Sequence, residues 1–288
     1  MTTKKESAES TEVAVKNTSL AAAPDFADMS DFGAGFGNAD AESFAIPFLQ
    51  VLQKMSPQVD EDDPKYIAGA KAGMILDTVT QRVFDGQTGI QIIPCHFKRT
   101  FIRWGGRESA EGGFKGEISV EEMKALIDSG QVKLVDGRYY WPNEDGTVNE
   151  KKNDYFADTR SHYVIYIDPE TGEQCRALLS LSSSMIKASR MLLTALSNRK
   201  VDTPRGKLTP PTFMNVVRLT TQGMKNDKGT WSAAKFDIEG LVTDSALYND
   251  AKSFHKDVDQ GNVEVDHSKQ GAPSESPVGD KPEDAEAF

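Results

Sequence analysis

The sequence contains few of the residues that disulfide, metal and redox chemistry require. Its 288 residues include only two cysteines and four histidines. Cys95 and Cys175 each lie in an apolar run, which favours a reduced setting over a disulfide framework. No apolar segment is long enough to cross a bilayer, and the amino terminus lacks the apolar core of a signal peptide. We therefore expect a cytoplasmic protein with no cofactor, no metal site and no membrane contact.

Enzyme signatures are also lacking. Gly206-Lys207 has neither the upstream glycine nor the following Ser or Thr of a phosphate-binding loop. The glycines of segment 33–37 do not lie between a predicted strand and a predicted helix, so they are not a dinucleotide fingerprint. Paired carboxylates such as Asp154 and Asp158 are expected to be solvated rather than catalytic. We predict no catalytic residues, and a metal-dependent nuclease is the least favoured class of function.

The formal net charge of −11 is concentrated at the two ends of the chain. Residues 1–43 carry three basic and eight acidic side chains, residues 259–288 carry two and eight, and residues 44–258 are neutral. Both end segments are poor in large apolar residues and are expected to be disordered. This predicts an acidic N-terminal arm (1–43), a β-rich core (44–258) and an acidic C-terminal tail (259–288). A neutral core can still carry a basic groove, which acidic arms would shield.

The pattern of the core predicts more hairpins than helices and no regular alternation of strand and helix. Strands are expected at 46–53, 74–80, 90–104, 163–167, 177–181, 213–220 and 231–242, with a further hairpin at 132–141. Helices are expected at 120–129 with a Ser119–Glu122 capping box, at 184–198 with Ser182 or Ser183 as cap, and at 245–258 with Thr243 or Asp244 as cap. This order predicts an α+β fold with a mainly antiparallel β core, OB-like or a related partly closed barrel.

The segment His96–Trp104 interleaves aromatic and basic side chains on a predicted strand. With a period of two, Phe97, Arg99, Phe101 and Arg103 share one face, while Lys98 and Trp104 belong to the other. Single-strand binders combine stacking rings with cations in this way, because every nucleotide has a π-face and a phosphate. The alternative is a strand whose aromatics are core and whose basic side chains cover its rim. Candidate DNA contacts here are Lys98, Arg99, Phe101, Arg103 and Trp104.

Further candidates for DNA contact lie outside this strand. Tyr140, in the Tyr139-Tyr140-Trp141 cluster, can stack on a base or close a core. Lys187 and Arg190 lie three residues apart on the predicted helix, and Arg205 and Lys207 lie in the basic loop that follows it. These four cations suit phosphate contact. The alternative interpretation is that they are ordinary solvated surface residues.

The acidic tail ends in Lys281-Pro-Glu-Asp-Ala-Glu-Ala-Phe288. An apolar ring beside acidic side chains resembles the C-terminal tip of single-stranded-DNA-binding proteins from bacteria and their phages. The resemblance implies that Asp284, Glu286 and Phe288 bind replication proteins (polymerase, helicase or primase). It also implies that the tail competes with DNA for the protein's own groove.

Together these features favour a non-sequence-specific single-stranded-DNA-binding protein of phage DNA replication or recombination, acting in the host cytoplasm. The alternative is a protein–protein adaptor or virion structural protein with acidic solubilising arms. A homo-oligomer and strand annealing are both left open. The DNA-binding hypothesis requires a continuous cationic cleft, so it fails if Arg99 and Arg103 lie inside sealed ion pairs and no continuous positive channel is left on the surface.

Overall fold

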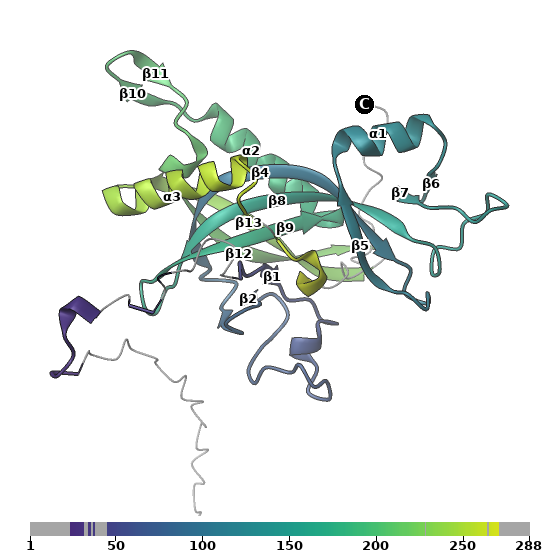
Figure 1. Ribbon diagram of the computed structural model, residues 1–288, viewed down its shortest axis with the longest axis horizontal. Coiled ribbons are helices and arrows are strands. Elements are labelled where there is room, and N and C mark those ends of the chain that lie inside the picture. The colour runs from purple at the N-terminus through teal and green to yellow at the C-terminus, as the bar shows by residue number, and fades with distance from the viewer. Residues whose placement is uncertain are drawn as a thin grey trace, which may run out of the picture.

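A computed structural model of the chain describes residues 24–31, 34, 35, 37, 45–227, 229–263 and 265–270. The described residues form mainly antiparallel β-structure flanked by three α-helices (Figure 1). The main sheet curls into a half-barrel, so the predicted α+β fold with an OB-like, partly closed β core is confirmed.

The main sheet has eight strands in the order β13-β12-β4-β8-β7-β6, with β5 paired to β4 and β9 paired to β8. These strands are β4 (Ile90–Gly105), β5 (Gly113–Ile118), β6 (Lys133–Val135), β7 (Arg138–Tyr140), β8 (Tyr155–Ile167), β9 (Gln174–Ser182), β12 (Asn215–Asn226) and β13 (Gly229–Leu241). The prediction of a long strand over 90–104 is confirmed. Strand β5 was not predicted, because its glycines indicated a loop.

β4 and β8 pair along almost their full lengths and form the spine of the sheet. Both are longer than their outer neighbours, so the sheet has two lobes on one spine. β9, β12 and β13 surround one end, and β5, β6 and β7 surround the other. Register shifts after Pro94 and after Arg103 interrupt the ladders of β4, and such bulges increase the twist that curls a sheet.

Two smaller sheets flank the main one. β1 (Leu49–Val51), β2 (Ile75–Asp77) and β3 (Val83–Phe84) form a three-stranded sheet. β10 (Val201–Thr203) and β11 (Gly206–Leu208) form a separate ribbon that projects from the body after the end of helix α2 (Figure 1). Short 3₁₀ turns are η1 (Met29–Asp31), η3 (Pro57–Val59), η4 (Ser183–Met185), η5 (Thr212–Met214) and η6 (His267–Gln270).

Two of the three helices begin as predicted. In α1 (Val120–Asp128), the Glu122 N–H donates to Ser119 Oγ and the Ser119 N–H donates to the Glu122 carboxylate, which is the expected capping box. In α3 (Ser245–Asp259), the Asp244 carboxylate accepts from the Ala246 N–H. The predicted serine cap of α2 (Ile186–Asn198) is wrong, because η4 leads directly into this helix without a side-chain cap.

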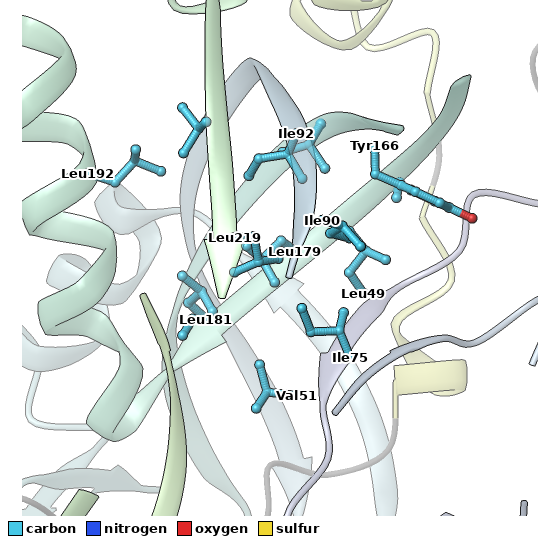
Figure 2. Close-up of a cluster of buried hydrophobic side chains, with 14 of the residues drawn as sticks. Leu49, Val51, Ile75, Ile90, Ile92, Tyr166, Leu179, Leu181, Leu192 and Leu219 are labelled. Carbon is cyan, nitrogen blue, oxygen red and sulfur yellow. The ribbon is translucent and has the colours of Figure 1, made fainter. Parts of the chain in front are cut away.

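The core of the first lobe lies on both faces of the spine. Alternate residues of β8 point to opposite faces, so Val164 and Tyr166 contribute to one cluster and Tyr163 and Ile165 to the other. The first cluster includes Leu192 of α2 and the strands β1 and β2 (Figure 2). The second includes Ala251, Phe254 and Val258 of α3. The two helices therefore cover opposite faces of the sheet.

The segment after α3 continues across the core. Val263 and Val265 pack against the α3 cluster, and His267 is buried. The His267 ring lies 5.6 Å from the Phe48 ring and 5.9 Å from the Phe114 ring, centroid to centroid. Val263, Val265 and His267 therefore pack against the body, although they lie within the predicted C-terminal tail (259–288).

Candidate nucleic-acid interface

The aromatic–basic strand lies in β4, and its arginines form ion pairs with one carboxylate in β8 and one just before it. Arg99 donates through Nε and Nη2 to the Asp158 carboxylate at 3.1 and 2.9 Å. Arg103 pairs with Asp154, with Nε and Nη2 at 2.8 and 2.7 Å from the same oxygen. The two arginine side chains remain 29% and 34% exposed. Both predicted phosphate contacts are thus occupied by ion pairs at a partly open surface.

The aromatic residues predicted to stack on bases are buried. Phe101 is 2% exposed and packs with Met123 of α1, while Trp104 is 1% exposed and packs against Phe114. Tyr140 is 3% exposed and lies against Tyr155. The three rings belong to the two apolar clusters of the second lobe. The burial of Phe101, Trp104 and Tyr140 leaves their ring faces inaccessible to a base in this conformation.

The guanidinium groups of this lobe cover aromatic rings instead. Arg103 lies over the Trp141 ring at 4.7 Å from its centroid, and Arg99 lies over the Phe101 ring at 5.6 Å. Lys98 lies over Tyr163 on the opposite face of the spine. An ion pair combined with a cation–π contact stabilises a rim arginine. These contacts fit the alternative interpretation of this strand, in which the aromatic side chains belong to the core and the basic side chains cover its rim.

The remaining predicted cations lie together on one continuous piece of the chain. Lys187 and Arg190 are exposed on α2, and Arg205 and Lys207 are exposed on the β10–β11 ribbon that follows it. Arg199 and Lys200 connect the helix to the ribbon. We call these six residues the basic track.

The sequence contains a signal for this track that the pattern analysis missed. Residues 174–226 carry nine basic side chains and a single acidic one, Asp202, in a protein whose net charge is −11. This stretch therefore has a net charge of +8 over about one quarter of the core. Arg176 and Arg218 form ion pairs with α3 and β13, and the six residues of the basic track supply most of the remaining positive charge. Met191 and Leu208 are 64% and 49% exposed on the same helix and ribbon.

A further arginine, absent from the predicted set, joins the basic track to the spine. Arg160 of β8 lies opposite Arg99 of β4 and is only 8% exposed. Its Nη2 donates to Asp158 at 3.3 Å, and its Nε is buried without a hydrogen-bond partner. Burial lowers the pKa of Arg160, Asp158 raises it, and the charges of Arg99 and Arg190 lower it further. Ser189, the neighbour of Arg190 on α2, contacts His162, which lies two residues after Arg160 on β8.

Three features of the described residues bear on metal binding and on side-chain reactivity. Three or more His, Cys, Asp or Glu side chains do not converge there on a candidate metal site. His162 Nε2 lies 2.7 Å from Ser189 Oγ, but both side chains are buried, and burial lowers the pKa of His162 to about 4. Burial also raises the pKa of the Cys95 thiol to about 12, which keeps it protonated.

The predicted partner-binding residues Asp284, Glu286 and Phe288 lie outside the described residues. Most of the predicted N-terminal arm does so too. The charge of both segments is known from the sequence alone.

Comparison with known proteins places the chain in a phage family. The model of the family described as Pam3 phage gp34-like protein matches residues 15–264. Because the match covers most of the chain, this protein belongs to that family, and the phage part of the predicted resemblance is confirmed. No curated protein matches the chain, and no solved structure does. Among the described helices, none has the length and apolar character needed to span a bilayer.

Proposed function

We propose that this phage-family protein binds single-stranded DNA without sequence preference, in phage DNA replication or recombination. The basic track carries the interaction, and β4 serves mainly as the support of its own lobe. Lys187 and Arg190 on α2, together with Arg205 and Lys207 on the ribbon, would contact successive phosphates.

The observation that carries the proposal is the charge contrast between residues 174–226 and the rest of the chain. Proteins with a strongly negative net charge are repelled by DNA unless one surface concentrates positive charge. Here six of the nine basic residues of that stretch lie on one helix and the ribbon directly after it. Electrostatic binding of this kind is independent of base sequence and falls steeply with salt.

Exposed apolar side chains favour a single strand over a duplex. Met191 and Leu208 lie among the cations of the basic track, where they can contact the faces of unpaired bases. Bases in a duplex offer their faces only to each other. The ribbon is also a separate two-stranded unit, which suits it to reach along an extended strand.

The acidic segment 271–288 would regulate this interaction. It carries five acidic side chains and one lysine, so it is attracted to the same cations as DNA. When DNA leaves, this segment would cover the track, and when DNA is bound it would be free to recruit replication proteins such as a polymerase, helicase or primase.

Fluorescence anisotropy with labelled oligo-dT tests the proposal directly. We expect binding at low salt and an affinity that falls as salt rises, with a slope of about −0.7 per phosphate contact. The double variant Arg205→Gln/Lys207→Gln should reduce that slope by about 1.4. Absence of binding at micromolar protein and low salt would favour the adaptor or virion role, in which the same surface docks an acidic protein segment.

A further inference from the structure

The tip of the β10–β11 ribbon is held in one conformation by local bonds. The two strands pair with each other and with no other described strand, and the ribbon projects from the body (Figure 1). Thr203 Oγ1 accepts from the Arg205 N–H at 3.2 Å and donates to the Gly206 carbonyl oxygen at 2.7 Å. Pro204 lies in the same turn, where its ring fixes φ. The tip is therefore stiff although it is surrounded by solvent.

The base of the ribbon is fixed to the body. Thr209 Oγ1 accepts from the Lys200 ammonium group and donates to the Ser197 carbonyl oxygen of α2 at 3.4 Å. Pro210, two residues after β11, is buried. These contacts set the direction in which the ribbon leaves the end of α2. A projection that is already ordered loses little conformational entropy when it binds a rigid, preformed surface.

The ribbon carries two cations that have no partner in the described part of the chain. Arg205 and Lys207 are exposed, and neither forms an ion pair or a side-chain hydrogen bond with the described residues. By contrast, Arg176 of β9 and Arg218 of β12 are both ion-paired. Asp202 lies across the ribbon from Lys207 and offsets part of its charge. The ribbon therefore presents positive charge that is available to a polyanion.

The ribbon also has an apolar face. Val201 and Leu208 lie directly opposite each other in the register, on the face away from Asp202 and Lys207. Leu208 is 49% exposed. The floor of a duplex groove consists of base edges, which accept apolar contacts such as those to the methyl group of thymine. A stiff ribbon with one apolar face and two available cations thus matches a groove that phosphates line on both sides.

We propose that the ribbon enters the major groove of duplex DNA at a junction between single-stranded and double-stranded DNA, while α2 holds the adjoining single strand. A two-stranded ribbon, with strands about 4.8 Å apart, fits into a groove about 12 Å wide. Arg205 and Lys207 would contact phosphates at the edges of the groove. Because the ribbon directly follows α2, a strand bound along the helix leads to it. This inference rests on the proposed function, since it names the DNA structure that the same surface recognises.

Fluorescence anisotropy with three labelled probes tests the inference: oligo-dT of about twenty nucleotides, the same oligo-dT joined to a duplex of about fifteen base pairs, and that duplex alone. We expect the tailed duplex to bind about tenfold more tightly than oligo-dT at low salt. The double variant Arg205→Gln/Lys207→Gln should reduce this preference to about twofold or less. The matched control Lys187→Gln removes a cation of α2, so it should weaken binding to both probes and leave their ratio unchanged.

A photocrosslinking experiment locates the ribbon without any loss of binding. We expect a photoreactive benzoylphenylalanine in place of Leu208 to crosslink to the duplex part of the tailed probe. Crosslinks confined to the single strand would overturn the inference. Circular dichroism melts establish that each variant is folded.

The outcomes distinguish this inference from the proposed function. If the wild type binds oligo-dT and the tailed duplex equally well, the junction is not recognised, the inference fails and the proposed function stands. If the double variant keeps the full preference for the tailed duplex, the ribbon does not recognise the duplex and the inference fails again. If the duplex alone binds and oligo-dT does not, or if no probe binds, the proposed function fails, and the inference fails with it.

Discussion

His162 on β8 and Ser189 on α2 are joined by a hydrogen bond of 2.7 Å between Nε2 and Oγ, and both side chains are buried. This hydrogen bond connects α2, the helix of the basic track, to the spine of the sheet. The pKa of His162 is lowered to about 4, mainly by burial and further by the charge of Arg160. The histidine is therefore neutral in the folded protein at pH 7.

This pairing predicts an acid-sensitive fold. The pKa of His162 is depressed in the folded state, so the unfolded chain binds a proton more readily as pH falls below about 6.5. The stability that the neutral His162 contributes is fully present above pH 6.5. It is lost progressively down to about pH 4, and the total loss in the free energy of unfolding is on the order of 3 kcal/mol. Urea denaturation of wild type and His162→Gln across this range measures it. The variant should lose less stability on acidification, and equal losses would contradict the assignment.

The buried rings of the second lobe predict a separation of stability from DNA affinity. Phe101→Ala should lower the free energy of unfolding by about 3–5 kcal/mol, because Phe101 is 2% exposed against Met123. DNA affinity, measured at a temperature where the variant is folded, should stay the same. Lys207→Ala should show the opposite behaviour, with weaker DNA binding and an unchanged thermal midpoint. A loss of affinity in folded Phe101→Ala would restore the stacking hypothesis.

Local patterns in the sequence predict the elements of this fold well where the signal is short-range. The Ser119–Glu122 capping box, the Asp244 cap and the hairpin within 132–141 are all found as expected. Each depends on residues only a few positions apart. The same holds for β4, whose alternating pattern marks it as a strand.

The environment of β4 could not be predicted in the same way. β8 begins at Tyr155, eight residues before the predicted strand, because its first half is polar. Asp158 in that half pairs with Arg99, Asp154 just before β8 pairs with Arg103, and α1 covers Phe101. Whether a ring stacks on a base or fills a core depends on these long-range neighbours. Arg160 was missed for the same reason, since its neighbours Arg99 and Arg190 are far from it in sequence.

The backbone at Gly89, in the turn before β4, accepts only a glycine without strain. Gly89 has φ of +65°, and a Cβ atom at this position would collide with the Leu219 carbonyl oxygen of β12. Gly89→Ala should therefore destabilise the protein by about 2–4 kcal/mol, through backbone strain and the steric clash. Gly172→Ala is the matched control, because Gly172 has φ of +76° but open space around it. Its cost should be about 1 kcal/mol in the same thermal or urea denaturation.

Removal of the acidic segment 271–288 should tighten DNA binding. The segment carries a net charge of −4, so we expect it to compete with DNA phosphates for the cations of the basic track. We expect the truncated protein to bind oligo-dT several-fold more tightly at low salt, with the difference disappearing as salt screens both interactions. Anisotropy titrations of both proteins over a range of salt concentrations measure this.

A control is needed to distinguish competition at the track from a general reduction of negative charge. Replacing the five acidic residues of the segment by Asn or Gln, at full length, should reproduce the effect of the deletion. Neutralising an equal number of exposed acids on the body, such as Glu61, Asp62, Glu144, Glu150 and Glu173, should have a smaller effect, because those side chains belong to a folded surface and cannot reach the track. Equal effects from both sets would show that net charge alone sets the affinity, and the segment would then have no specific role at the DNA-binding surface.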